Sequence, residues 1–314
     1  MLSRTADHLY WMARYIERTE NVARVLDVTY NMSLLPSDSS NEKELWDAVL
    51  EIAGIRDIYD STYKELNATN VIKHLVMDSN NPSSIYSSLR SARENARAVR
   101  VAMTTETWEN MNTLWLEFGQ YIKQDLTQTG LSEFCEWVKS RSHLFRGVCF
   151  GTMLRDEAFS FVRLGTFMER ADNTARLLDV KYEFLLPMQE ANDGAVDYYE
   201  WSAVLRSVSA FQAYQKVYRD AIEPMKVSEL LILREDMPRS LHACYAEIMP
   251  ILRQVAGSRQ TEAERLAGQM HAKLHYGRML DIVKDGVHHF LDEFILANRK
   301  LGEEIQRNFL SATA

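Results

Sequence analysis

The 314-residue chain contains little glycine, proline or cysteine. Its 12 glycines and 6 prolines supply few turns for an all-β protein and favour long, uninterrupted helices. Its 3 cysteines, Cys135, Cys149 and Cys244, are odd in number and form no CxxC pair. This pattern argues against a disulfide framework and predicts a reducing, cytoplasmic environment. Because long apolar runs are also missing, we expect neither a signal peptide nor a membrane-spanning helix.

Positive charge is also in deficit, since 36 basic side chains face 44 acidic ones and the net charge is −8. Nucleic-acid binding needs a surplus of lysine and arginine, so we predict no nucleic-acid partner. The sequence has no GxxxxGK[ST] or GxGxxG loop for phosphates. It also lacks the paired Glu-x-x-His motifs of di-iron bundles, so nothing in these motifs requires an enzyme.

Apolar residues recur three and four positions apart along most of the chain, which predicts an all-α fold. Loop compositions rich in Ser, Asn, Asp and Pro separate the periodic segments. The expected helices cover residues 2–33, 42–60, 68–78, 82–104, 106–124, 131–150, 155–185, 196–220, 226–233, 238–273 and 276–309. We expect the segment 238–273 to bend or split near Pro250 and Gly257.

The chain contains an internal repeat. Residues 15–30, YIERTENVARVLDVTY, match residues 167–182, FMERADNTARLLDVKY, at nine of sixteen positions. The register continues with small slips, and it reaches an offset of 156 residues later in each half. A period this long is unlike that of a solenoid. We therefore predict an internally duplicated helical bundle, with related halves 1–150 and 151–314 that share a core.

The repeated helix carries charged residues although most of its surface is apolar. Its polar face comprises Arg14, Glu17, Glu20, Asn21, Arg24 and Asp27 in the first copy, with Arg18 at the border, and Glu169, Asp172, Asn173, Arg176 and Asp179 in the second, with Arg170 at the border. Buried charges are costly unless they are paired, so these groups need partners. One interpretation is salt bridging between helices, supported by i,i+4 pairs such as Glu20–Arg24 and Asp172–Arg176. The other is a functional site.

A row of arginines follows one side of the helix expected after Pro82. This arginine row consists of Arg90, Arg93, Arg97 and Arg100, beside a core stripe in which Ala92 and Ala96 allow close helix approach. Only Arg253 has a matching place in the second half at an offset of 156. Like charges at this spacing repel, so we expect an anion to face them: the carboxylates of the first helix, or a bound phosphate, carboxylate or acidic peptide. The alternative is a satisfied salt-bridge network or a solvated face.

Metal and cysteine chemistry have weak signals. His271 and His275, in HAKLH, lie four residues apart and could clamp one metal ion. The central Glu of HExxH is missing and no third ligand is obvious nearby, so we predict no metal site. Cys149 follows His143 by six residues without the sequence context of a catalytic pair.

Four separated motifs together resemble those of the bacterial alpha-E family, an all-helical domain named for its Glu-Arg motif. The motifs are Glu17-Arg18 with Asn21, Ala23-Arg24 and Leu26-Asp27; the copy Leu164–Asp172; Ser91–Arg97; and Thr152–Glu157. The resemblance covers essentially the whole chain. It departs at Thr166, where Leu-Gly-Arg versions of the motif carry a basic residue.

The resemblance implies partners more than an activity. Family members are typically encoded beside, or fused to, a circularly permuted ATP-grasp protein, often with a transglutaminase-like peptidase nearby. These neighbouring genes imply ATP-dependent amide or peptide-bond formation, in which a carboxylate is activated as an acylphosphate and passed to an amine. The chain itself would then need no cofactor, because ATP and Mg²⁺ would be held by the partner ligase.

Three functional hypotheses follow. In the first, the chain is an accessory or substrate-binding partner of the ligase, and an acidic small molecule or peptide binds Arg90, Arg93, Arg97, Arg100, Glu94, Asn21 and Arg24. In the second, the chain is an enzyme that forms or cleaves amides, with Glu17 or Glu169 as general base beside Arg18 or Arg170. In the third, it is a purely structural scaffold, and a homo-oligomer remains open.

Overall fold

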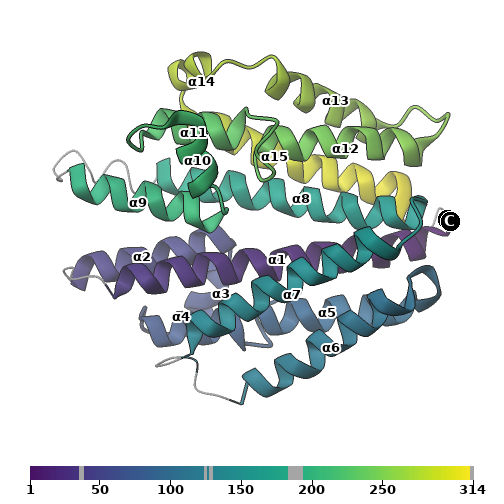
Figure 1. The fold of residues 1–314 in the computed structure, drawn as a ribbon, viewed down its shortest axis with the longest axis horizontal. Helices are drawn as coiled ribbons and strands as arrows, with labels where there is room; N and C mark the ends of the chain where they lie inside the picture. The colour runs from purple at the N-terminus through teal and green to yellow at the C-terminus, as the bar shows by residue number, and fades with distance from the viewer. Residues whose placement is uncertain (35–38, 124–125, 127–129, 183–193, 312–314) are drawn as a thin grey trace. The chain divides into compact units, whose positions relative to one another are not determined.

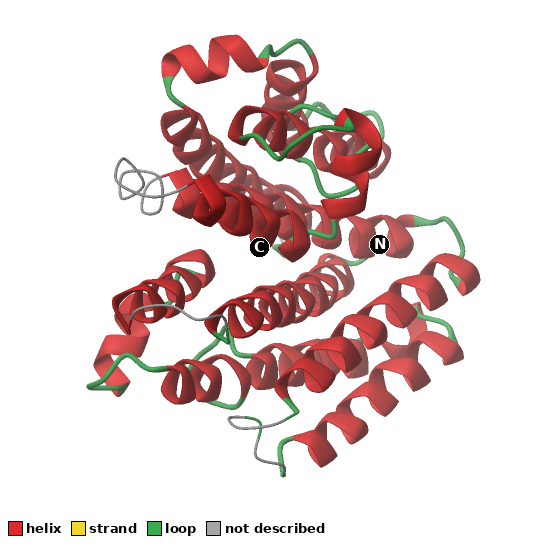
Figure 2. Cartoon of the chain, turned by 60° about the vertical axis from the view of Figure 1, so that its left-hand side comes forward, coloured by secondary structure: helices red, strands yellow, loops and turns green. Residues whose placement is uncertain are grey.

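The computed structural model describes residues 1–34, 39–123, 126, 130–182 and 194–311 (Figure 1). Within these ranges the regular structure is entirely helical, and Figure 2 shows no strand among them. The predicted all-α class is confirmed.

The first six α-helices are α1 (Ser3–Ser33), α2 (Ser39–Ala53), α3 (Arg56–Thr62), α4 (Ala68–Val76), α5 (Ile85–Ala98) and α6 (Thr105–Tyr121), with a 3₁₀ turn at Arg100–Ala102. Then come α7 (Leu131–Thr152), α8 (Glu157–Val180), α9 (Gly194–Ser207), α10 (Phe211–Tyr218) and α11 (Pro224–Ile232). The last are α12 (Leu241–Ala256), α13 (Glu262–His275), α14 (Met279–Asp285) and α15 (Val287–Ile305), followed by a π-helical turn at Gln306–Leu310.

Three segments that the sequence predicts as single helices are each divided by one residue with positive φ. Gly54 (φ 64°) separates α2 from α3, Ser209 (φ 53°) separates α9 from α10, and Gly286 (φ 98°) separates α14 from α15. A residue in this region ends the ladder of helical hydrogen bonds. The predicted break at Gly257 (φ 62°) is present, whereas Pro250 lies inside α12 without ending it.

The chain divides into two compact units, Met1–Thr166 and Phe167–Ala314, and the division falls within α8. The predicted duplication and shared core of the halves 1–150 and 151–314 stay predictions.

Four helices of the first unit form a closed ring of neighbours. Helix α1 packs against α5, α5 against α6, α6 against α7, and α7 against α1 (Figure 1). The core stripe of α5 is buried as predicted, and Ala92 and Ala96 within it are fully covered. Their small side chains permit the close approach of neighbouring helices. The arrangement is a four-helix bundle that places α1 between α5 and α7.

In the second unit, a buried polar contact links α8, α12 and α15. The Tyr245 hydroxyl on α12 donates to Asn298 Oδ1 on α15 at 3.0 Å, and Asn298 Nδ2 donates to the Met168 carbonyl on α8 at 3.4 Å. Helix α13 covers α12 and α15. Across the described part of the chain, every helix is too short or too polar to cross a membrane.

Two glycines give opposite predictions for substitution by alanine. A Cβ at Gly165 would overlap the Tyr10 carbonyl oxygen and lie 3.2 Å from Ala13 Cβ, whereas a Cβ at Gly147 would meet nothing within 4 Å. We expect Gly165→Ala to lower the free energy of unfolding by at least about 2 kcal/mol through overpacking. Gly147→Ala should raise it by about 0.5–1 kcal/mol, because alanine favours the helix interior. Urea unfolding measures both, and equal effects would contradict this account.

Candidate functional site

The centre of α1 buries two carboxylates. The side chains of Glu17 and Glu20 are both 0% exposed, and Arg24, one turn further on, is 7% exposed. Residues three, four and seven positions apart lie on one face of a helix, so these side chains form one stripe. The stripe faces α7, where its partners lie.

Helix α7 and α1 itself supply donors for both carboxylates. Arg146 Nη1 donates to Glu17 Oε2 at 2.9 Å and to Glu20 Oε2 at 2.5 Å. Ser142 Oγ donates to Glu20 Oε2 at 2.6 Å. Arg24 donates through Nε and Nη2 to Glu20 Oε1, at 2.9 and 2.8 Å. We call Glu17, Glu20, Arg24, Ser142 and Arg146 the ER network; its two carboxylates and two guanidiniums balance in charge.

Two further residues of α7 extend this contact. Arg24 Nη2 donates to His143 Nε2 at 3.1 Å, so that nitrogen carries a lone pair, and the imidazole is about half exposed. Lys139 Nζ donates to Asp27 Oδ2 at 2.9 Å. The partners on α7 were not predicted from the sequence. The available signal was the spacing of Lys139, Ser142, His143 and Arg146, which puts polar groups on one face of a buried helix.

This bonding pattern favours charge stabilisation over proton transfer. Both oxygens of Glu20 already accept hydrogen bonds, and the fork of Arg24 is used on Glu20 and His143. Glu17 is fully covered and held by Arg146. A general base must reach the proton that it removes, so the predicted catalytic role of Glu17 would require the ER network to open. Asn21, a predicted ligand-binding residue, is also buried, at 4% exposure.

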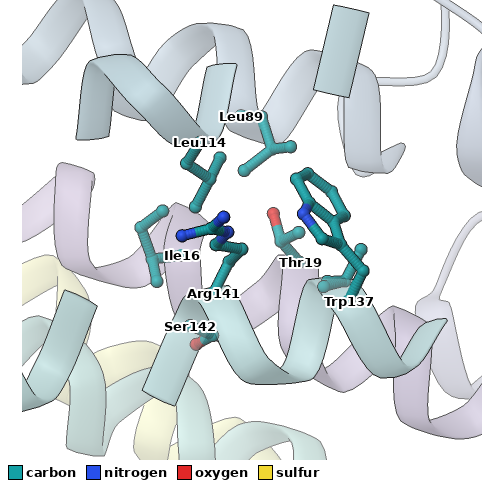
Figure 3. A pocket seen from close by; sticks show the side chains of 8 residues that line it. Ile16, Thr19, Leu89, Leu114, Trp137, Arg141 and Ser142 are labelled. Carbon is teal, nitrogen blue, oxygen red and sulfur yellow. The ribbon is translucent and has the colours of Figure 1, made fainter. Parts of the chain in front are cut away.

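A small cavity lies beside the ER network (Figure 3). It is lined by Ile16 and Thr19 of α1, Leu89 of α5, Leu114 of α6, and Trp137, Val138, Arg141 and Ser142 of α7. Its volume of about 10 Å³ accommodates at most one water molecule. It therefore cannot hold an amino acid or a peptide.

The arginine row lies in a different interface. Arg93 Nε donates to Asn112 Oδ1 on α6 at 3.2 Å, and the Arg100 guanidinium lies 5.6 Å from the Trp108 ring centre. Glu94 pairs with Arg93 and Arg97, at 3.3 and 3.4 Å. The row thus borders α6, whereas the ER network joins α1 to α7, and the structure does not bring the two groups into one site.

The carboxylates that the sequence analysis considered as partners of the row are engaged elsewhere. Glu17 and Glu20 pair with Arg146, and Asp27 pairs with Lys139.

The second copy of the motif, on α8, is also largely covered. Glu169 is 6% exposed, and Arg170 donates to the Pro238 carbonyl at 3.4 Å with its guanidinium 5.3 Å from the Phe167 ring centre. In the first copy, the Arg18 guanidinium similarly lies 5.7 Å from the Tyr15 ring centre. The predicted i,i+4 pairs are both present, Glu20–Arg24 at 2.8 Å and Asp172–Arg176 at 2.7 Å.

A contact between a carboxylate and an imidazole near the end of α8 resembles the Asp27–Lys139 pair of the first unit. Asp179 Oδ1 lies 2.7 Å from His288 Nδ1 on α15. Burial raises the pKa of Asp179 above its usual value, and the hydrogen bond to His288 opposes this rise. The carboxylate at the end of each repeated helix is thus held by a basic group from another helix of its own unit.

The cysteines are buried thiols. Burial raises the pKa of Cys149 to about 12 and raises that of Cys135 as well. Cys244 is also buried and forms no disulfide. Because the thiolate is the reactive form, Cys135 and Cys149 are poor nucleophiles.

The helical fold and the repeated Glu-Arg helix agree with a family comparison. Residues 1–310 match Alpha-E, described as a predicted alpha-helical domain with a conserved ER motif. The chain belongs to the Alpha-E family. The Glu-Arg pairs on α1 and α8 of this Alpha-E chain are Glu17-Arg18 and Glu169-Arg170.

Its curated relatives are longer proteins. The Alpha-E chain is 24% identical to an uncharacterised protein of Mycobacterium bovis and to one of Mycobacterium tuberculosis strain CDC 1551, and 23% identical to one of strain H37Rv. Each match covers 93% of this chain but only 35% of the relative, so the chain spans about a third of their length. No solved structure matches it significantly.

The ER network gives a test of its structural role. Arg146→Met would leave two fully buried carboxylates without their shared guanidinium, so we expect a loss of about 3–5 kcal/mol in the free energy of unfolding. The matched control is Arg141→Met on the same helix, whose pair with Glu117 at 2.5 Å is more than a quarter exposed on both sides. That substitution should cost about 1 kcal/mol or less. Urea unfolding distinguishes them, and similar losses would argue against the buried network.

Proposed function

We propose that this Alpha-E chain is a non-catalytic partner of an ATP-grasp amide or peptide ligase, and that it presents the arginine row to a carboxylate or phosphate group. The observation that carries the proposal is an exposed, unbalanced row of positive charge on α5 and on the 3₁₀ turn that follows it. The sequence predicts one helix over 82–104, whereas α5 ends at Ala98 and Arg100 lies in the turn. Arg90, Arg97 and Arg100 are exposed, and the carboxylate within the row, Glu94, pairs with Arg93 and Arg97.

The chemistry of the arginine row suits the binding of an anion better than a purely structural role. Guanidinium groups bind carboxylates and phosphates through paired N–H donors. In the described part of the chain Arg90 forms no ion pair, and the Arg97 side chain is 67% exposed. Four guanidiniums beside one carboxylate leave a local positive surface on a chain whose net charge is −8. An acidic small molecule or peptide is therefore the favoured ligand class.

The ER network favours a binding role over the alternative in which the chain is itself an enzyme. Its carboxylates are covered and its guanidiniums are used between α1 and α7. The cavity beside it is too small for a substrate. The network therefore serves the fold, whereas the arginine row is exposed at the surface of the first unit.

The ligase part of the proposal rests on the family resemblance. Proteins of this kind typically accompany a circularly permuted ATP-grasp protein, often with a transglutaminase-like peptidase. The relatives are about three times as long as the matched region, which suits a domain that works beside other domains. ATP and Mg²⁺ would be bound by the ligase, which would form the acylphosphate while this chain holds the acidic substrate.

Binding of an acidic peptide tests the arginine row directly. A fluorescein-labelled oligoglutamate peptide should bind the purified chain, more weakly at high salt, as measured by fluorescence anisotropy. We expect the double variant Arg90→Ala/Arg97→Ala to lose at least about 10-fold in affinity, the equivalent of one charge-assisted hydrogen bond.

Arg253→Ala is the matched control for this experiment. Arg253 takes the place of Arg97 in the repeat, its side chain is 73% exposed, and it lies 3.5 Å from Glu264, much as Arg97 lies 3.4 Å from Glu94. The Arg253→Ala variant should bind the peptide as tightly as the unaltered chain does. An equal loss in both variants would reduce the binding to non-specific charge attraction and overturn the assignment of the row.

Co-purification with a circularly permuted ATP-grasp protein from the same source tests the partnership. We expect a stable complex in which ATP turnover on acidic amino acids or peptides depends on the Alpha-E chain. The Arg90→Ala/Arg97→Ala variant should still form the complex, because its changes are confined to an exposed row, yet turnover should fall. If the complex forms but ATP turnover is the same with the Arg90→Ala/Arg97→Ala variant as with the unaltered chain, the scaffold alternative is favoured. The absence of any complex would overturn the partnership.

A further inference from the structure

Three histidines lie close together in the second unit, whereas the HAKLH motif in the sequence contains only two of them. His271 and His275 occupy the last turns of α13 and share one face, four residues apart. His242 stands in the first turn of α12, which packs against α13 (Figure 1). One ligand nitrogen of each ring lies within 4.8 Å of the others. The third ligand, which the sequence analysis did not find near HAKLH, is thus supplied by the neighbouring helix.

A backbone contact fixes the tautomer of His242. Its Nδ1 lies 2.8 Å from the carbonyl oxygen of Leu233, at the C-terminal end of α11. A carbonyl only accepts, so Nδ1 carries the hydrogen, and in the neutral ring Nε2 keeps its lone pair. The same arrangement, in which the outer nitrogen donates to a carbonyl, orients histidines that ligate metals. His242 is only 4% exposed, so the ring is also held by packing.

The separations suit tetrahedral coordination. Two nitrogens bound to one zinc ion at its usual bond length in a tetrahedron lie ~3.3 Å apart. His242 Nε2 and His275 Nδ1 are 3.4 Å apart, and the three ligand atoms all lie within 4.8 Å of one another. The three ring centres are 5.3–5.7 Å from one another.

The surroundings of His271 favour the neutral form of that ring. Burial, followed by the neighbouring His242 and His275, lowers the pKa of His271, while Glu235 opposes the shift. Glu235 is exposed, and the nearby Arg234 is paired with Asp236 at 2.5 Å. Neutral imidazole nitrogens are the ligands that zinc and related transition metals prefer.

Packing alone does not require histidines at these positions. In the register of the predicted repeat, at an offset of 156, His242 and His271 take the places of Tyr86 and Trp115. Those two rings pack against each other in the first unit with centres 5.8 Å apart, close to the 5.6 Å of His242 and His271. Ordinary aromatic side chains thus fill the equivalent contact between α5 and α6.

We propose that His242, His271 and His275 bind a divalent transition-metal ion, zinc in the first instance. Three protein nitrogens leave the fourth tetrahedral position for water, as in open zinc sites. That position faces solvent, because His275 is exposed and His271 is partly exposed. The site belongs wholly to the second unit, so it is independent of the arginine row and of the proposed ligase partnership.

Metal titration of the full chain, prepared without a histidine tag and stripped with a chelator, tests this site. We expect one equivalent of Zn²⁺ to bind in competition with a chromophoric chelator, and Co²⁺ to give the visible absorption of tetrahedral coordination. Zn²⁺ should also raise the melting temperature, since a ligand that binds only the folded chain stabilises it.

Ligand variants decide whether the bound metal is at this site. His275→Ala should weaken Zn²⁺ binding at least about 100-fold, beyond what the loss of an outer-shell partner costs. His271→Ala should do the same, and both positions are accessible enough for the chain to fold without them. The control is His289→Ala on α15, whose side chain is 67% exposed and which should bind like the unaltered chain.

Two results would overturn the proposal. One is that the unaltered chain binds Zn²⁺ no more tightly than the His275→Ala variant does. In that case the 3.4 Å contact is a hydrogen bond between His242 and His275 and the cluster is a packing feature. The other is equal weakening in the His289→Ala control, which would assign the binding to scattered surface histidines.

Discussion

The first unit depends on the burial of two carboxylates, those of Glu17 and Glu20, between α1 and α7. Removing a carboxylate from water costs several kcal/mol, and the cost is offset only where the geometry of the counter-charge is good. Arg146 meets this condition by reaching both carboxylates from one nitrogen, while Ser142 and Arg24 complete Glu20. If α7 were shifted by one turn along α1, the two buried carboxylates would lose these partners. The ER network therefore sets the register of the two helices, which apolar packing alone would fix less sharply.

Much of this architecture can be predicted from the sequence, because its causes are local. Periodicity identifies the helices, and the pairs Glu20–Arg24 and Asp172–Arg176 follow from helix geometry. The splits at Gly54 and Gly286 were missed because one left-handed residue interrupts a helix without disturbing the apolar pattern on either side. At Ser209 the signal is weaker still, since serine gives no hint of a positive φ.

The partners of the candidate sites could not be predicted in the same way. Arg146 is 129 residues from Glu17, and only the packing of α7 on α1 brings them together. The prediction of no metal site took account only of His271 and His275, because 33 residues and a helix boundary separate His242 from His275. The pairing of the arginine row with Glu17, one of the alternatives that the sequence leaves open, rested on charge complementarity, which does not say which neighbour of α1 supplies the cation.

Comparison of the halves, in the register of the predicted repeat, indicates which features folding does not require. The arginine row has alanine, methionine and arginine in its places on α12, and the aromatic pair Tyr86–Trp115 stands where the second unit has two histidines. Each half thus packs without the special chemistry of the other. The buried glutamate is different from these features, because it is present in both repeated helices. It is Glu17 in α1 and Glu169 in α8, and it is buried in both. The buried glutamate common to both halves therefore serves the helix contacts, whereas groupings confined to one half, such as the complete arginine row and the three histidines, are where binding should be sought.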